Sequence, residues 1–169
     1  MALVLTSSNF KEGAALPMDH ILSSDYGFGC SGGNKSPHLA WTGAPAGTKS
    51  FAVHCFDPDA PTGSGFWHWV VVNIPATVTE LKLDAGNPKS GLLPKGALQT
   101  RTDFGAPGYG GPCPPPGDHP HRYLFTVFAV GVDKLQVGAD TSAAVIGFQL
   151  HFNTLAKAAI MGLYKRRSA

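Results

Sequence analysis

The spacing of apolar residues predicts three β-strands in the middle of the chain. The first covers residues 51–56, the second 68–74 and the third 122–132. Each is a short run rich in β-branched and aromatic residues, which is typical of strands in a sheet. The loops between them are long and irregular, and long loops in compact domains are often functional. We therefore expect a sheet whose loops carry the chemistry.

Alternation within two of these segments predicts which side chains share a face of the sheet, because successive strand residues point to opposite faces. In the segment 66–73 one face would comprise Phe66, His68, Val70 and Val72, and the other Trp67, Trp69, Val71 and Asn73. At the third strand one face would comprise His121, Tyr123, Phe125 and Val127, with Arg122 on the other. An imidazole and a phenol would thus lie side by side at the start of that strand.

The pattern changes after Asp140, where a helix is predicted. Thr141 can cap its N-terminus, because a side-chain oxygen there accepts a hydrogen bond from a free backbone N–H. Apolar residues then recur at helical spacing, at Val145, Phe148, Phe152, Leu155 and Ala159. The final segment 159–166 fits either another strand or the frayed end of this helix.

Composition narrows the fold class to a strand-dominated domain. The 169 residues include 21 Gly and 14 Pro, and only 14% are charged, against roughly 25% in typical soluble domains. Gly and Pro break helices, and the Lys and Glu needed for exposed helical faces are scarce, so a helical bundle is excluded. Because 43% of the residues are hydrophobic, the chain can still bury a core. We predict a single, mostly β domain over residues 1–169.

Charge and targeting signals argue against several classes of partner. A net charge of +2 with scattered Lys and Arg argues against nucleic acid, and we interpret the cluster Lys165, Arg166 and Arg167 as a solvated tail. The N-terminus lacks the basic region and long apolar core of a signal peptide. The longest apolar stretch contains His68 and Pro75, so no membrane span is predicted.

The cysteines predict neither a disulfide framework nor a metal site. Cys30, Cys55 and Cys113 make an odd count, which favours free thiols in a reducing cytosol and hence a cytoplasmic protein. Cys113, His119 and His121 lie close in sequence but lack the paired spacing typical of zinc ligands. We therefore predict no metal and no other cofactor.

A rigid acidic segment follows the first strand. Two prolines stiffen residues 57–61 (DPDAP), and extended geometry would place Asp57 and Asp59 on the same side. Such a pair can orient a cation or a hydroxyl, or share a proton. The alternative is an Asx turn, in which each Asp hydrogen-bonds to its own backbone. His68, just downstream, favours a pocket, because its protonation is tunable near neutral pH.

A second stiff segment, 109–117 (YGGPCPPPG), precedes the third strand. Gly110 and Gly111 can let backbone N–H groups approach an anion as a nest, and His121 and Tyr123 follow on one strand face. The alternative is a polyproline surface loop or a ligand for an aromatic-grooved partner. That alternative does not explain why the imidazole and the phenol share a face.

Together these motifs resemble one known family. DPDAP, HWVVVN, GPCPPPG and HRY, in this order and separation, are similar to the phosphatidylethanolamine-binding proteins (PEBPs), and more narrowly to their bacterial and archaeal Raf-kinase-inhibitor-like group. The resemblance runs almost end to end and includes GGNKSPHLAW at 32–41 and the terminal LYKRR. His38 departs from it, since the family commonly has a second proline there.

The resemblance implies a large antiparallel sheet, a smaller second sheet and a few peripheral helices. It also implies a small anion-binding cavity for phosphate-bearing headgroups, in a family not known for catalysis. Carried over residue by residue, the ligand-binding set would be Asp57, Asp59, Pro61, His68, Tyr109, Gly111, Pro112, His121 and Tyr123. The residues themselves offer no activated nucleophile and no ordered acid–base pair, so no catalytic residue is assigned.

Two aspartates beside an anion need an explanation, because like charges repel. An Asp can be protonated, or a histidine can be charged. A third arrangement has an Asp facing the ligand's ammonium group while backbone amides and Tyr123 hold the phosphate. We favour the third arrangement combined with a histidine that donates to the phosphate, because it suits a zwitterionic phosphoethanolamine head.

Three function classes follow. The first is a non-catalytic binding protein for phosphorylated small molecules, phospholipid headgroups or phosphorylated protein segments, with a regulatory role toward a kinase. The second is a serine proteinase inhibitor that presents proline-stiffened loops. The third is a phosphoester hydrolase or lyase using Asp57, Asp59 and His68 as acid–base groups. We rank them in that order; a homodimer is compatible with the family, although no sequence feature marks an interface.

Overall fold

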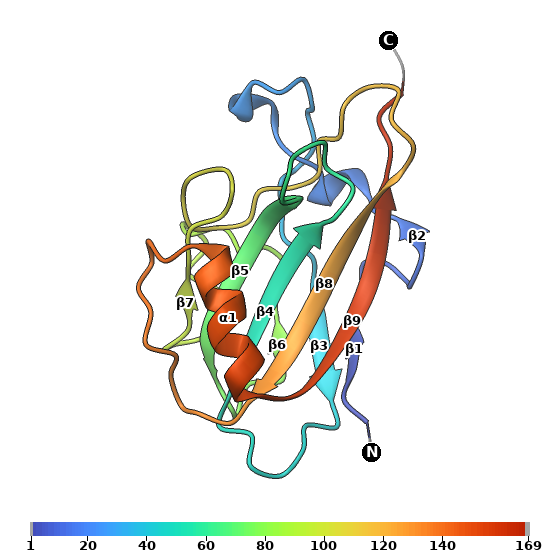
Figure 1. The fold of residues 1–169 in the computed structure, drawn as a ribbon. Helices are drawn as coiled ribbons and strands as arrows, with labels where there is room; N and C mark the ends of the chain where they lie inside the picture. Colours follow the sequence, from blue (N-terminus) through green and yellow to red (C-terminus); the bar gives the residue numbers. More distant parts are fainter. Residues whose placement is uncertain (1, 168–169) are drawn as a thin grey trace.

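Two β-sheets form the framework of the protein (Figure 1). The computed structural model describes residues 2–167. The smaller sheet has three strands in the order β1 (Val4–Thr6), β3 (Leu39–Thr42) and β6 (Glu80–Leu81). The larger sheet has six strands in the order β2 (Ala14–Ala15), β9 (Thr154–Tyr164), β8 (His121–Val130), β4 (Ser50–Asp57), β5 (Phe66–Pro75) and β7 (Leu98–Gln99).

Helices are short and peripheral. Two are single 3₁₀ turns, η1 (Met18–His20) and η2 (Ser24–Tyr26), and the third is the α-helix α1 (Ala143–Asn153). The strands pair antiparallel except at the edge where β2 runs parallel to β9. This confirms the predicted fold class, a mostly β protein with a large antiparallel sheet, a smaller sheet and few helices. Among residues 2–167, no helix is long and apolar enough to cross a bilayer.

The three predicted strands are confirmed as β4, β5 and β8. They are neighbours in the sheet, with β4 in the middle and paired antiparallel to both of the others. Neighbours in an antiparallel sheet run in opposite directions. The C-terminal end of β4 and the N-terminal ends of β5 and β8 therefore meet at the same end of the sheet, at the top of Figure 1.

The main hydrophobic core lies between the two sheets. Buried side chains from both of them meet there, for example Trp41 of β3 and Phe125 of β8. A second cluster lies on the opposite face of the large sheet, where Ile146 of α1 packs near Val72 of β5. Both faces of the large sheet are thus covered by apolar contacts, which explains why its central strands are nearly continuous apolar runs.

A bulge in β5 overturns the predicted alternation of that strand. Cys55 of β4 pairs with Trp69, but the next residue pairs with Trp67, so His68 is an extra residue without a partner across the ladder. A bulge of this kind shifts the side-chain alternation on either side of it. As a result Val70 and Val72 pack in the cluster under α1. Phe66 and His68 instead lie on the other face, against aromatic residues of the pocket described below.

The predicted helix exists, but its cap and its buried face differ from the prediction. Ser142, not Thr141, is the N-cap, and its side chain accepts a hydrogen bond from the N–H of Val145. The expected apolar face is exposed, with Phe148 at 66% and Phe152 at 69%. The helix packs instead through the smaller residues Ala143, Ile146 and Leu150. The sheet face beneath α1 consists mainly of the small residues Ala52, Val70, Val72 and Val130, and the aliphatic side chains of the helix pack closely on it.

The end of the chain is a strand and not a frayed helix. Strand β9 begins at Thr154, directly after α1, and runs to Tyr164 along the whole of β8. Leu155 and Ala159, which the spacing had assigned to the helix, therefore belong to β9. The choice between the two alternatives depends on pairing with β8, a contact far away in sequence.

The cysteine prediction is wrong. Cys30 and Cys113 form a disulfide with Sγ atoms 2.13 Å and Cα atoms 5.9 Å apart, and the free cysteine is Cys55, buried in the core. An odd count is compatible with one bridge plus one packed thiol. The cytoplasmic location stays a prediction, but it no longer has support from the cysteines, because stable disulfides are typical of oxidising compartments.

Removal of the disulfide should weaken the fold measurably. The bridge closes a segment of 83 residues, and loops of this length lose several kcal/mol of unfolded-state entropy when cross-linked. In urea unfolding at fixed pH, we expect the double variant Cys30→Ala/Cys113→Ala to be about 2–4 kcal/mol less stable than the oxidised protein. Wild-type protein in excess reductant is the control and should match the variant. Equal stability of all three samples would contradict a structural role for the bridge.

Candidate functional site

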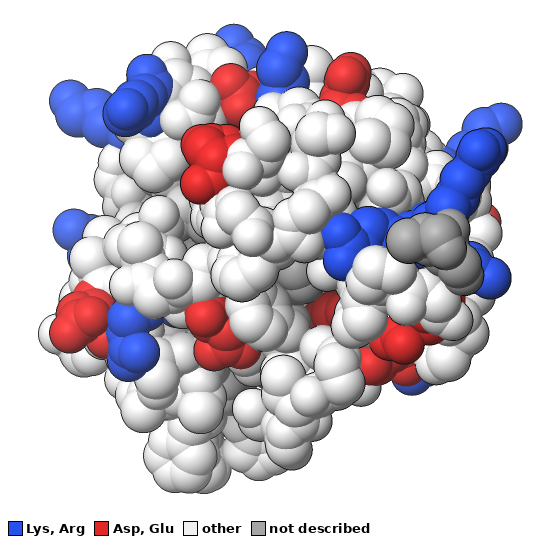
Figure 2. All heavy atoms as spheres, turned by 90° about the horizontal axis from the view of Figure 1, so that it is seen from above, with Lys and Arg blue, Asp and Glu red and all other residues white. Residues whose placement is uncertain are grey.

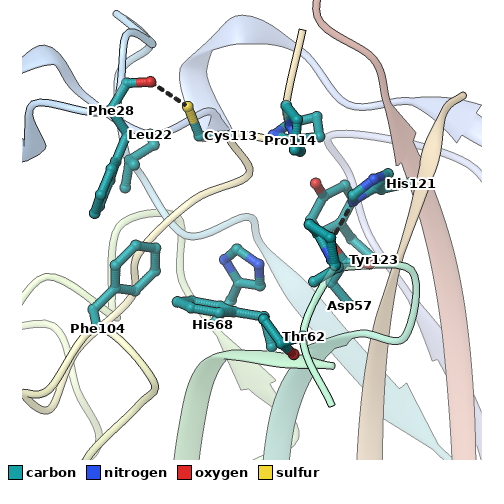
Figure 3. Close-up of a pocket in the computed structure, with 14 residues that line it drawn as sticks. Leu22, Phe28, Asp57, Thr62, His68, Phe104, Cys113, Pro114, His121 and Tyr123 are labelled. Atoms are coloured by element: carbon teal, nitrogen blue, oxygen red, sulfur yellow. Dashed lines mark hydrogen bonds and ion pairs between the residues drawn. The ribbon is translucent and has the colours of Figure 1, made fainter. Parts of the chain in front are cut away.

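A small pocket lies where the end of β4 meets the starts of β5 and β8 (Figure 3). Its volume is about 210 Å³, below the roughly 300–1,000 Å³ of sites for drug-sized ligands. Strand ends supply the polar side chains, and loops that lie far apart in the sequence supply the walls. The lining residues are Leu22, Phe28, Asp57, Ala60, Pro61, Thr62, Phe66, His68, Phe104, Cys113, Pro114, Pro115, His121 and Tyr123.

Part of the predicted set comes together in this pocket. The predicted residues that line it are Asp57, Pro61, His68, His121 and Tyr123. The predicted residues that do not line it are Asp59, Tyr109, Gly111 and Pro112. The face shared by His121 and Tyr123 is confirmed, since both are buried while Arg122 on the other face is exposed. The ligand-binding role of the whole set stays a prediction.

Asp59 turns away from the pocket, so the predicted pair of carboxylates on one side is wrong. Its carboxylate accepts three hydrogen bonds from Arg122, at 2.8 Å from the backbone N–H and at 3.0 and 2.9 Å from the guanidinium. The Arg122 hydrogen bonds lower the pKa of Asp59 to about 2. Asp57 Oδ1 accepts the backbone N–H of Asp59 at 2.8 Å. This is the Asx turn that the sequence offered as the alternative.

The segment 109–112 supports the pocket from behind. The Tyr109 hydroxyl donates to the carbonyl of His20 at 2.8 Å. The predicted anion nest is wrong, because the Gly110 N–H donates to the carbonyl of His68 and the Gly111 N–H to Asn34 Oδ1. At Gly111 a Cβ would collide with the backbone carbonyl of His20, so glycine is required there for close packing.

The carbonyl of Pro112 accepts the N–H of Leu22 at 3.0 Å. This bond ties the proline-rich loop to the segment that follows η1, and Leu22 itself lines the pocket. Pro112 therefore acts on the pocket through the backbone of its neighbour.

His121 is held between two carboxylates and is the positive charge of the site. Its Nδ1 lies 2.8 Å from Asp57 Oδ2, its Nε2 lies 2.9 Å from Asp118 Oδ2, and its side chain is 1% exposed. Burial alone would lower the pKa of His121, but the hydrogen bonds to Asp57 and Asp118 outweigh burial and raise it. Both ring nitrogens then donate, as only an imidazolium can. The cation compensates the buried Asp57 carboxylate.

His68 is the opposite case, a buried and neutral histidine. Its Nδ1 lies 2.7 Å from the carbonyl of Gly110, and because a carbonyl only accepts, Nδ1 carries the hydrogen. Burial lowers the pKa of His68, although the bond to Gly110 partly opposes this. Nε2 is then an acceptor, has no partner among residues 2–167, and belongs to a ring that projects into the pocket (Figure 3).

Tyr123 adds a hydroxyl beside these groups. The hydroxyl oxygen is buried and has no hydrogen-bond partner in the described part of the chain. Burial and the neighbouring Asp57 carboxylate raise the pKa of Tyr123, so the group stays a neutral donor. The polar groups of the pocket therefore offer one free acceptor, one free hydroxyl and a compensated ion pair.

No motif or spacing in the sequence indicated the apolar wall opposite these groups. Phe28 and Phe104 come from two separate loops and lie 6.3 Å apart between ring centroids, and Leu22 and Cys113 complete the wall. No Lys or Arg lines the pocket. Figure 2 views this end of the molecule and shows a hollowed surface bordered mostly by uncharged residues. Among residues 2–167, no group of three His, Cys, Asp or Glu side chains is arranged to hold a metal ion.

The arrangement defines a class: a two-sheet β protein with a small pocket at the ends of its central strands. The chain belongs to the phosphatidylethanolamine-binding protein family, whose model matches residues 6–165. It is similar to YbcL of Escherichia coli, with 53% identity over 164 residues that cover 97% of this chain and 88% of that protein. YbhB of the same organism is 51% identical over 95% of this chain and 98% of its own length.

Solved structures agree with this assignment. The crystal structure of E. coli YbcL, described as a member of the mammalian PEBP family, superposes with a TM-score of 0.94 at 51% identity and covers 99% of this chain and all of that one. Carboxypeptidase Y inhibitor, solved in complex with its cognate proteinase, shares only 20% identity, with a TM-score of 0.57 over 98% of this chain and 84% of that one. That second likeness shows the fold alone.

The charge on His121 can be tested by NMR titration. Asp118→Asn removes one carboxylate acceptor, so the pKa of His121 should fall relative to wild type. The exposed and remote His151 on α1 is an internal reference whose ring signals should be the same in wild type and variant. Because the folded pKa of His121 is raised, its stabilisation is full below the unfolded pKa of about 6.5 and is lost as pH rises through the folded value. The wild type should thus exceed the variant in stability most clearly near pH 6, and an unchanged His121 pKa would contradict the assignment.

Proposed function

We propose that the protein is a non-catalytic binding protein for small phosphate-bearing ligands, either phospholipid headgroups or phosphorylated small molecules. The observation that carries the proposal is the pocket itself, a small cavity bordered by the His121 imidazolium and by the unpartnered Nε2 of His68. The printed description of the matching family, a phosphatidylethanolamine-binding protein, supports the same ligand class. A regulatory role toward a kinase rests on the family resemblance, and the family match over 6–165 supports a single domain.

The pocket accommodates a phosphate by taking up a proton, because Asp57 and Asp118 already compensate the positive charge of His121. His68 is neutral in the free protein, so it donates to a phosphate only after taking up a proton, or it accepts a hydrogen bond from a singly protonated phosphate. Both routes leave the complex with one proton more than neutral His68 and a phosphate dianion. An ammonium group of the same ligand would lie toward Asp57, whose oxygens each keep a free lone pair.

Binding without turnover is favoured over hydrolysis. The hydrolase alternative needs Asp57, Asp59 and His68 around one substrate, but Asp59 is engaged by Arg122 outside the pocket. Asp57 is also ion-paired to His121, which leaves no free carboxylate base next to His68. These contacts support a site that holds its ligand.

Proteinase inhibition is the second candidate. The observation in its favour is the stiff loop 112–116, which is anchored by the disulfide at Cys113 and by a hydrogen bond from Arg166 to the carbonyl of Pro114. A rigid segment binds a proteinase with little loss of conformational entropy, and Pro116 is the exposed residue of this loop, whereas Pro112 and Pro114 are buried. The inhibitor neighbour supports this only at the level of the fold. An assay of serine proteinases with and without the protein distinguishes this candidate from the first.

Matched tyrosine and histidine variants test the binding site. In calorimetry with O-phosphoethanolamine, we expect Tyr123→Phe and His68→Ala each to weaken binding roughly fivefold or more, the equivalent of one hydrogen bond of about 1 kcal/mol. Tyr164→Phe and His119→Ala are the controls, because both residues lie outside the pocket lining. Equal affinities for the pocket variants and their controls would refute the proposed site.

Proton coupling gives an independent test. Burial lowers the pKa of His68, and a phosphate monoester loses its second proton near pH 6. Above both pKa values binding requires uptake of about one proton, so affinity should fall by up to about tenfold per pH unit. Calorimetry at pH 8 in two buffers with different protonation enthalpies should report this uptake. Affinity that is constant between pH 6 and pH 8.5 would contradict the proposed role of His68.

A further inference from the structure

One wall of the pocket is a loop that is held to the rest of the protein by few contacts. Residues 23–31, here called the lid, run from the end of Leu22 to the start of Gly32 and carry Phe28 into the pocket lining. Phe28 is nevertheless 59% exposed. The lid closes on itself at its base, where the Gly32 N–H donates to the carbonyl of Leu22 at 2.8 Å.

Hydrogen bonds do little to hold the lid in place. Within the lid, the backbone N–H groups of Tyr26 and Gly27 donate to the carbonyls of Ser23 and Ser24. In the described part of the chain, the lid's hydrogen bond to a distant segment comes from Arg166 Nη1, which donates to the carbonyl of Phe28 at 3.0 Å. A segment with so few bonds belongs to the low-stability end of a protein.

Side-chain contacts add a weak attachment. The rings of Tyr26 and Phe28 lie 5.2 and 6.3 Å from the ring of Phe104. Arg166 links the lid to the proline-rich loop, because its Nε also donates to the carbonyl of Pro114 at 2.8 Å. The ring contacts thus join the lid to the loop that carries Phe104, and Arg166 joins it to the proline-rich loop.

The covalent attachment is the disulfide between Cys30 of the lid and Cys113 of the proline-rich loop. Cys113 lines the pocket, and its Sγ lies 3.5 Å from the carbonyl oxygen of Phe28 (Figure 3). The two sulfurs differ in access, since Cys30 is 5% exposed whereas Cys113 is half-buried. The bridge therefore joins the lid to the opposite rim at a point that a reagent can reach from the Cys113 side.

We propose that the Cys30–Cys113 disulfide is a site of thiol–disulfide exchange with a dithiol reductant, and that its reduction releases the lid from the pocket. A thiolate of the reductant attacks Cys113 Sγ, the S–S bond breaks, and Cys30 leaves as a thiolate that takes up a proton. The second thiol of the reductant then attacks the mixed disulfide and releases Cys113. The protein gains two thiols, and the reductant is oxidised to its own disulfide.

Release of the lid alters the pocket and not only the loop. Phe28 and Cys113 contribute to the apolar wall that faces His68 and Tyr123, so opening the bridge exposes these polar groups to water. Exclusion of water is what makes hydrogen bonds in a pocket effective. The reduced form should therefore bind a phosphate-bearing ligand more weakly, a consequence that rests on the proposed function.

The first experiment follows the lid without any ligand. The folded protein is treated with dithiothreitol, the new thiols are counted by alkylation and mass spectrometry, and amide exchange is followed by NMR. After reduction, the N–H groups of Leu22, Tyr26, Gly27 and Gly32 should exchange at least about tenfold faster, while those in the middle of β8 should change less than about twofold. Cys55, buried in the core, should remain unalkylated and shows that the protein has stayed folded.

The variant Cys30→Ala/Cys113→Ala provides the open lid without reductant. Its exchange rates should match those of the reduced protein, and dithiothreitol should not change them further. If the variant does not fold, the reduced wild type carries the test alone. A bridge that dithiothreitol cannot open in the folded protein, or a lid whose exchange is unchanged after opening, would overturn the proposal.

The second experiment measures binding of O-phosphoethanolamine to the oxidised and reduced forms by calorimetry. We expect the reduced form to bind at least about fivefold more weakly. Equal affinity of the two forms, with the lid shown to be open, would mean that the lid does not contribute to binding. That result would overturn the proposal that reduction weakens ligand binding. Absence of binding in both forms, with the lid opening as expected, would instead refute the proposed function and leave the exchange site supported by the first experiment.

Discussion

The buried ion pair between Asp57 and His121 is the interaction on which the pocket depends. Asp57 ends β4 and His121 begins β8, so their 2.8 Å contact ties neighbouring strands together at the end of the sheet where the pocket lies. Removing one partner of such a pair typically costs about 3–5 kcal/mol, because it leaves an uncompensated buried charge. Asp118 holds the other ring nitrogen and so keeps the imidazole charged. The pair leaves Nε2 of His68 and the hydroxyl of Tyr123 without hydrogen-bond partners among residues 2–167.

The bulge in β5 is the second constraint, because it determines on which face of the large sheet the ring of His68 lies. A regular strand would place His68 on the same face as Val70 and Val72, under α1. The extra residue opposite Cys55 and Phe56 turns the ring of His68 to the main-core side, where it lies 5.3 Å from the ring of Tyr123. The carbonyl of Gly110 then fixes its tautomer. One extra residue thus places the start of β5 in the lining of the pocket, while the rest of the strand remains in the core.

The many Gly and Pro residues around the pocket allow close packing and stiffen its walls. Gly111 allows the proline-rich loop to pack on the backbone of His20, and the prolines at 114 and 115 line the pocket with few free donors. The disulfide and Arg166 then join this stiff loop to the sparsely bonded lid. The site is therefore rigid on the side of the strands and the prolines, and its capacity for movement is concentrated in one covalently tethered wall.

The sequence by itself determined the fold class, the three central strands and the family, because apolar runs and turn residues are local signals that survive without tertiary contacts. The family resemblance of its motifs also implied that Asp57, His68, His121 and Tyr123 belong to one pocket. Only the tertiary structure decided that Asp59 pairs with Arg122 outside the pocket, that Tyr109, Gly111 and Pro112 support it from behind, and that Cys30 meets Cys113. It also decided the bulge at His68 and the side on which α1 is buried. Each of these depends on contacts between residues distant in the chain, and such contacts leave no trace in the spacing of one sequence.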